Sequence, residues 1–102
     1  MYWLICVIRA TALEEVREQL GEIGCLGVTV GHIQDYSSPN NYASVRLEVA
    51  CTQGELNLAI NAICKGARNE TNSMLLNDGK ILVFGLSDVI RIRTGESGKS
   101  AI

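Results

Sequence analysis

The fold is decided by residues 44–55, which read SVRLEVACTQGE. Over 44–51 apolar and polar residues alternate, and a period of two is typical of a strand with one covered face. The pattern places Val45, Leu47, Val49 and Cys51 on the inner face and Ser44, Arg46, Glu48 and Ala50 on the other. Thr52-Gln53-Gly54-Glu55 follows as a capping box, in which a threonine and a glutamate satisfy free amides at a helix start. The stretch therefore predicts a strand that leads directly into a helix.

The rest of the second half continues this pattern. The predicted helix has an apolar stripe formed by Leu56, Ala59, Ile60, Ile63 and Ala67. Residues 69–79 are mostly polar and indicate a turn or loop. A short strand is expected over 81–84, and a strand or extended segment over 89–93. The tail, about 94–102, holds two glycines and two serines and is expected to be flexible.

The first half repeats the same order. An apolar run over 2–8 predicts a strand, and Thr11-Ala12-Leu13-Glu14 is another capping box. The helix that follows has an apolar stripe of Leu13, Val16, Leu20 and Ile23, with Gly24 as its stop. A second strand is expected over 28–33, and residues 34–42, which include the only proline, form a loop.

Two strand–helix–strand halves predict a ferredoxin-like βαββαβ sandwich of the α+β class. It has a four-stranded antiparallel sheet with two helices on one face. We expect one domain over residues 1–102. The other sheet face, which bears Arg46 and Glu48, has no cover within so small a chain, so an oligomer is expected.

Composition narrows the classes of function. Apolar residues make up 47% and charged residues 20%, which excludes intrinsic disorder. No apolar run reaches the ~20 residues of a membrane span, and no leader pattern is present, so we expect a cytoplasmic protein. The net charge is −2 and only five residues are aromatic, which argues against nucleic-acid binding.

The sequence offers little for catalysis or metal binding. Cys6, Cys25, Cys51 and Cys64 form no CxxC pair and lie among apolar neighbours, and His32 is the only histidine. Buried thiols are therefore expected, with no metal site. Because no nucleophile–base pair is visible, we expect no catalytic residues, and an enzyme is the weaker hypothesis.

Two features are suited to binding an anion. In the turn Asp78-Gly79-Lys80, the glycine lets backbone amides approach an anion closely and the lysine adds a positive charge. In the extended segment that follows, Arg91 and Arg93 lie on one side, and the isoleucines on the other side would anchor it. The two features would converge around one short strand. An ordinary turn and a solvated strand face remain the alternatives.

These residues resemble the PII signal-transduction proteins. The resemblance rests on 78–83 and 88–96 with the end Ala101-Ile102, and on 13–16 and 23–30 in the first half. It implies a ferredoxin-like homotrimer that binds adenine nucleotides in the clefts between subunits. By position, Gly27, Val28 and Thr29 would line the adenine and ribose pocket, with Glu48 and Ala50 beside it. Phosphate would be held by Asp78, Gly79 and Lys80, and reached by Arg91 and Arg93 in part across the subunit boundary.

The sequence departs from the family in two loops. About ten residues, 35–44, replace the family's long loop, and Pro39 stands where a glutamine would help bind magnesium and 2-oxoglutarate. Tyr36 and Tyr42 lie at the ends of this loop rather than on an exposed tip, so tyrosine modification is not expected. The segment 68–77 is longer than the family's phosphate loop and lacks its glycines.

The resemblance implies a non-enzymatic regulator with ADP, AMP or ATP as effector and no cofactor. It would act on an unidentified partner protein, such as a transporter or a metabolic enzyme. The alternative is a PII-like trimer without nucleotide binding, which acts as a structural partner or responds to a small anion such as bicarbonate.

Overall fold

A computed structural model describes residues 1–25, 27–33, 44–68 and 80–102 of the chain. The four strands are β1 (Tyr2–Arg9), β2 (Val28–Ile33), β3 (Ser44–Cys51) and β4 (Ile81–Gly85). The two α-helices are α1 (Leu13–Glu22) and α2 (Leu56–Arg68). Three short 3₁₀ turns are η1 (Ala10–Ala12), η2 (Gln53–Glu55) and η3 (Gly98–Ala101). Each half of the chain thus contributes strand, helix and strand in that order.

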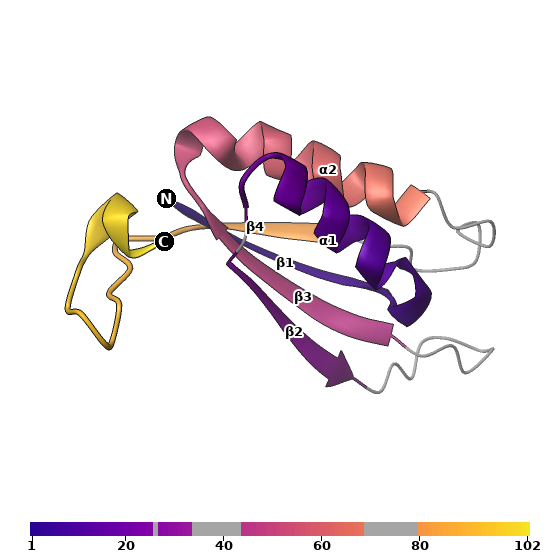
Figure 1. Cartoon of the computed structure of the whole chain (residues 1–102), viewed down its shortest axis with the longest axis horizontal. Coiled ribbons are helices and arrows are strands. Elements are labelled where there is room, and N and C mark those ends of the chain that lie inside the picture. The colour runs from indigo at the N-terminus through magenta and orange to yellow at the C-terminus, as the bar shows by residue number, and fades with distance from the viewer. Residues whose placement is uncertain (26, 34–43, 69–79) are drawn as a thin grey trace.

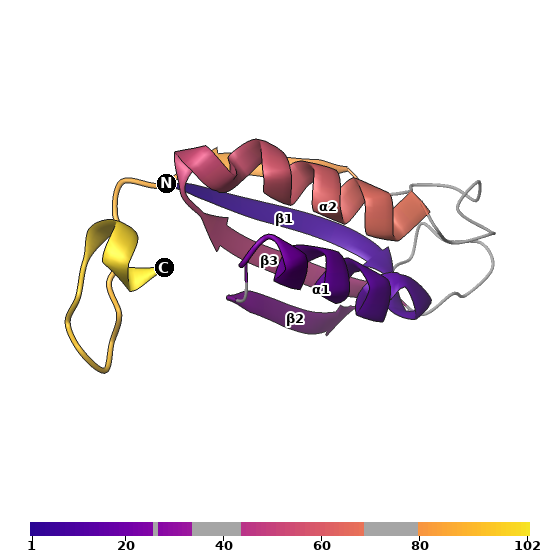
Figure 2. The ribbon, with the colours of Figure 1, turned by 45° about the horizontal axis from the view of Figure 1, so that its top comes forward.

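The four strands form one antiparallel sheet in the order β2-β3-β1-β4. Strand β1 pairs along its whole length with β3, and its first part pairs with β4. Both helices lie on the same side of this sheet (Figures 1 and 2). The expected ferredoxin-like sandwich is confirmed, and the sheet has one covered and one uncovered face.

The core fills the space between the helices and the sheet. The inward residues predicted for β3 are all buried, while Arg46 on the opposite side is exposed. From the helices, Val16, Leu20, Ala59 and Ile63 complete the core. The alternation along β3 was therefore sufficient to identify the covered face, because successive side chains of a strand point to opposite sides.

Helices α1 and α2 meet at a glycine. A Cβ atom added to Gly66 would lie 2.7 Å from Cα of Val16 and 2.9 Å from its backbone nitrogen. No real side chain tolerates that distance, so only glycine allows α1 to lie this close to α2. The apolar spacing of α2 did not reveal this contact.

The capping box after β3 is confirmed, and the one after β1 is wrong. The backbone N–H of Thr52 donates to Oε1 of Glu55 at 3.0 Å, and the Thr52 hydroxyl donates to the same oxygen at 2.8 Å. Before α2, Thr52 is the N-cap of the turn η2, whereas the N-cap of η1 is Arg9, so Thr11 lies inside that turn. No side chain caps η1 or α1. Glu14 instead accepts a hydrogen bond from Arg17 at 3.4 Å.

Helix α1 ends at the expected glycine. Gly24 has a φ of 82°, a value that side chains disfavour. The N–H of Cys25 donates to the carbonyl of Leu20 at 2.9 Å, and that of Gly24 to the carbonyl of Gly21 at 3.1 Å. This pair of bonds is a Schellman motif, and it turns the chain toward β2.

The strand or extended segment expected over 89–93 is not a strand: it has one bridge residue and then turns. A single bridge joins Ile90 to Ser97, and the chain between them turns back on itself. The isoleucines do not anchor it, because Ile90 is 65% and Ile92 100% exposed. The segment extends away from the sheet beyond β4 (Figure 1) and ends in η3, where Ala101 is buried. The flexibility expected for 94–102 stays a prediction.

Candidate functional site

Several of the expected site residues gather at one end of the sheet. Thr29 on β2 lies directly opposite Glu48 on β3, and both belong to the uncovered face. Ala50, two residues after Glu48, lies opposite Trp3 on β1. Gly27 directly precedes β2 at the same end, whereas Val28 points to the covered side. The strand register therefore brings Thr29, Glu48 and Ala50 to one face, with Gly27 beside them, but it places Val28 on the opposite face.

An ion pair fixes the carboxylate within this group. Nε of Arg46 lies 3.1 Å from Oε1 of Glu48, two residues along the same face of β3. The alternation had placed both residues on one face, but their pairing was not predicted. Opposite charges at positions i and i+2 of a strand were the signal that could have found it.

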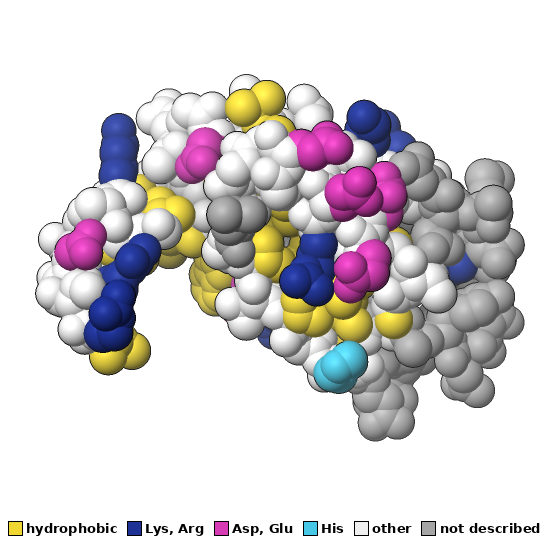
Figure 3. Space-filling model, in the orientation of Figure 1, with side chains coloured by type: hydrophobic (Ala, Val, Ile, Leu, Met, Phe, Trp, Pro, Cys, Tyr) yellow, Lys and Arg dark blue, Asp and Glu magenta, His cyan; other side chains and the backbone are white. Residues whose placement is uncertain are grey.

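Arg91 and Arg93 lie in the segment that leaves the sheet at this same end. Gly85, the last residue of β4, pairs with Tyr2, and the chain continues outward from there. Both arginines are exposed, and Nη2 of Arg91 donates to the backbone oxygen of Ile102 at 3.4 Å. Lys or Arg side chains are visible on the surface of this segment (Figure 3). It can therefore offer charged donors to an anion that approaches from solvent.

Lys80 lies at the other end of β4. It directly precedes Ile81, whereas the arginines follow Gly85, so the five residues of the strand separate them. At a rise of ~3.3 Å per residue this separation is roughly 16 Å along the strand. The expected convergence of Lys80 and the arginines within one chain is therefore wrong.

Asp78 and Gly79 lie outside the described residues, as do the loop 34–43 with Tyr36, Pro39 and Tyr42 and the stretch 69–77.

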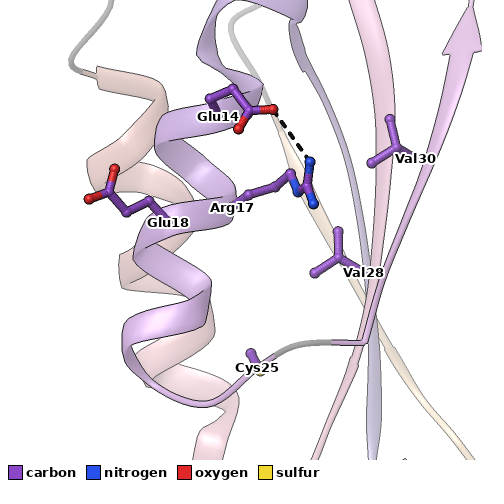
Figure 4. Close-up of a pocket in the computed structure, with 6 residues that line it drawn as sticks. All are labelled: Glu14, Arg17, Glu18, Cys25, Val28 and Val30. Atoms are coloured by element: carbon purple, nitrogen blue, oxygen red, sulfur yellow. Dashed lines mark hydrogen bonds and ion pairs between the residues drawn. The ribbon is translucent and has the colours of Figure 1, made fainter.

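A separate open pocket lies between α1 and β2 on the covered side. It is lined by Glu14, Arg17, Glu18, Cys25, Val28 and Val30. Figure 4 shows Arg17 between the carboxylate of Glu14 and the two valines of β2, with the ion pair at 3.4 Å. Only Val28 among the expected site residues lines it. Arg17 and Glu14 are both well exposed, so this ion pair contributes little to stability.

The cysteines behave as core residues. Burial raises the pKa of Cys6 to about 11, and the neighbouring Cys64 adds to the shift. Burial, followed by the negative charge of Glu55, raises the pKa of Cys25 to about 11 and also raises that of Cys51. A thiol with a raised pKa is a poor nucleophile and a poor metal ligand at neutral pH. The expected burial is confirmed for Cys6, Cys25 and Cys51, whereas Cys64 is only half-buried.

The described part of the chain has neither a metal-binding cluster nor a membrane-spanning helix. Among those residues, no three His, Cys, Asp or Glu side chains gather closely enough to hold a metal ion. None of the helices in the same residues has the length and apolar character needed to cross a membrane. His32 lies exposed on β2 at the edge of the sheet (Figure 3).

Comparisons with known proteins agree with the observed fold. Residues 1–96 match the family model described as nitrogen regulatory protein P-II. The nitrogen regulatory protein GlnK of Escherichia coli K12 is 36% identical over 110 residues, which cover 94% of this chain and 95% of that protein. A P-II homolog of Arabidopsis thaliana is 31% identical over 115 residues, and the match covers 98% of this chain but 57% of the homolog. Both alignments are longer than this chain, so both relatives contain residues that it lacks.

A solved structure supports the same relationship. The crystal structure of Arabidopsis thaliana PII bound to citrate superposes with a TM-score of 0.82 at 35% sequence identity. The superposition covers 98% of this chain and 87% of that one. Fold, sequence and family model coincide over nearly the whole chain. We conclude that this chain belongs to the PII family of nitrogen regulatory proteins.

Proposed function

We propose that the protein is a cytoplasmic, homotrimeric regulator that binds an adenine nucleotide in clefts between its subunits. It passes the state of that nucleotide to a partner protein, such as a transporter or a metabolic enzyme. It acts without catalysis and does not bind nucleic acid. One observation carries the proposal: the residues suited to hold the nucleotide are divided between the two ends of β4.

This division supports a cleft between subunits. The arginines follow β4 at one end and Lys80 precedes it at the other, while Thr29 and Glu48 lie between these two ends, level with Leu82. A single chain cannot place all of these groups around one phosphate chain. Two copies can, when Lys80 of one copy meets the arginines of its neighbour.

The uncovered sheet face supports assembly. On this face the rings of Trp3 and Phe84 contact each other at a tilt of 43°, with centroids 5.8 Å apart, and Leu82 beside them is 50% exposed. Exposed apolar residues that lie next to one another on a sheet favour burial against another copy. A homotrimer places this face toward the interior of the assembly.

A second candidate function is a PII-like trimer that responds to a small anion and not to a nucleotide. The observation that favours it is the citrate named for the Arabidopsis PII structure. Citrate is a small anion, and the exposed arginines of this chain are equally suited to such a ligand.

Calorimetric titration with ATP, ADP and AMP separates the two candidates. We expect at least one nucleotide to bind, and Lys80→Ala or Arg91→Ala to weaken its binding by more than about tenfold, because each removes a charged hydrogen-bond donor. The segment 68–77 lacks glycines, so fewer backbone amides are available to a terminal phosphate. We therefore expect ADP or AMP to bind as well as ATP or better. Strong preference for ATP contradicts this expectation, and no binding by any of the three favours the second candidate.

The loop departures give a related expectation. Magnesium-dependent binding of 2-oxoglutarate should be absent, because Pro39 has neither an amide side chain nor a backbone donor. Titration with 2-oxoglutarate in the presence of magnesium and ATP checks this. Binding at micromolar concentrations contradicts it.

Light scattering tests the assembly. The chain has a mass of 11.1 kDa, and we expect about three times that mass at micromolar concentration. A mass equal to that of one chain contradicts the trimer.

A further inference from the structure

The loop from Asp88 to Gly98, which we call the arginine loop, is closed at its base by one carboxylate. Oδ1 of Asp88 accepts hydrogen bonds from the backbone N–H of Val89 at 2.8 Å and from that of Gly98 at 2.9 Å. Asp88 and Gly98 are ten residues apart in the sequence. A single oxygen atom therefore joins the beginning of the loop to its end.

Backbone hydrogen bonds continue from this closure toward the arginines. The N–H of Gly98 also donates to the carbonyl of Val89 at 3.0 Å. Further along, the N–H of Arg91 donates to the carbonyl of Glu96 at 2.8 Å, and that of Gly95 to the carbonyl of Arg91 at 2.7 Å. Both polar groups of the Arg91 backbone are therefore hydrogen-bonded within the loop, which holds that backbone in place.

Apolar burial does not hold the arginine loop in place. Ile92 at its tip is fully exposed, Ile90 is mostly exposed, and Ala101 beyond the loop is the first buried residue that follows. A segment with few buried contacts opens at low free-energy cost. The path of the loop therefore depends on its hydrogen bonds, and the Asp88 carboxylate supplies two of them.

We propose that Asp88 is a positioning residue for nucleotide binding: it closes the arginine loop, so that Arg91 and Arg93 are held ready for the phosphates of a nucleotide. This inference rests on the proposed function. The physical reason is preorganisation, since donors already held in place lose less conformational entropy when the ligand binds. Asp88 itself carries a negative charge and does not contact the phosphate.

Three single variants test the proposal by calorimetric titration with ADP. Asp88→Ala removes both hydrogen bonds, and we expect ADP to bind roughly tenfold more weakly. Asp88→Asn keeps an oxygen that accepts both bonds, and we expect affinity within about threefold of the parent. Glu96→Ala is the matched control, because it removes a nearby carboxylate while its backbone carbonyl still accepts from Arg91. Each of Asp88→Ala and Glu96→Ala removes one negative charge, which by itself should slightly strengthen the binding of an anion. A loss of ADP affinity in Asp88→Ala alone is therefore due to the lost hydrogen bonds that close the loop.

A double-variant background separates positioning from a general structural effect. In a chain with Arg91→Ala and Arg93→Ala, titrated to millimolar ADP, adding Asp88→Ala should change the affinity by less than about twofold. The thermal midpoint should stay within a few degrees of the parent, because the loop lies outside the core. A further tenfold loss in this background, or a large fall of the midpoint, overturns the positioning role.

The two proposals fail in different ways. If the parent binds ADP and Asp88→Ala binds it as tightly as Glu96→Ala does, the positioning role of Asp88 is wrong and the proposed function stands. If the parent itself binds neither ADP nor any other adenine nucleotide, the proposed function is wrong and the role of Asp88 falls with it.

Discussion

The two faces of the sheet have opposite roles. On the covered face Leu47 is 0% exposed and belongs to a continuous core beneath α1 and α2. On the uncovered face Leu82 is half exposed, and Arg46 and Glu48 form an ion pair there. The comparison shows that the core residues lie on one face of the sheet only. We propose that the other face, with the arginine loop, serves assembly and ligand binding.

The largest expected effect contrasts one leucine from each face. Leu47→Ala should lower the free energy of unfolding by about 2–5 kcal/mol, because it leaves a cavity in the core. Leu82→Ala should instead weaken assembly, so that its effect on the thermal midpoint shrinks as protein concentration rises. Thermal unfolding at several concentrations measures both. Equal, concentration-independent losses in the two variants would break the comparison.

The next effect concerns the contact between the helices. Gly66→Ala should lower the free energy of unfolding by about 1–3 kcal/mol, since its Cβ would overlap the backbone of Val16. Gly21→Ala is the matched control, because Gly21 is in α1 and has nothing within 4 Å of an added Cβ. That control should leave stability unchanged or raise it by up to about 1 kcal/mol. Chemical denaturation measures both, and a neutral Gly66→Ala contradicts the close approach of the helices.

A smaller effect distinguishes the two predicted capping boxes. Thr52→Ala should lower the free energy of unfolding by about 1 kcal/mol, because it removes one side of a capping box that is formed. Thr11→Ala should change it by less than about 0.5 kcal/mol, because no side chain caps α1. Denaturant titration of both variants checks this. A larger loss at Thr11 than at Thr52 would reverse our assignment of the boxes.

The last prediction concerns Cys6 on the covered face, whose burial makes the free energy of unfolding depend on pH. An unfolded thiol loses its proton near pH 9.0, whereas the pKa of folded Cys6 is raised by burial to about 11. The folded chain therefore holds more protons between these values, and the free energy of unfolding should fall as pH rises from 9 to 11. Cys6→Ala should show a shallower fall over the same range. Identical slopes for parent and variant contradict this contribution of Cys6.

The sequence was sufficient to predict the covered face and the order of the elements. The alternation around Leu47 and the apolar stripes of the helices depend on local periodicity, which a single chain displays directly. The box at Thr11 failed because β1 continues to Arg9, which takes the N-cap of η1, and the pattern does not specify where the strand ends. The separation of Lys80 from the arginines was missed because residue spacing does not specify the ends of β4. The closure by Asp88 was missed because it joins residues ten apart, and no local periodicity marks such a contact.

The most direct test of the central claim mixes two variants that should each bind nucleotide more than about tenfold more weakly than the parent. Lys80→Ala and Arg91→Ala chains are co-expressed, purified as mixed assemblies and titrated with ADP beside each variant alone. If a cleft takes Lys80 from one copy and Arg91 from its neighbour, some clefts of the mixed assembly contain both groups, and binding of parental affinity returns in a fraction of the sites. If the two groups act within one chain, every cleft lacks one of them. The mixture then binds no better than either variant alone, which contradicts the account.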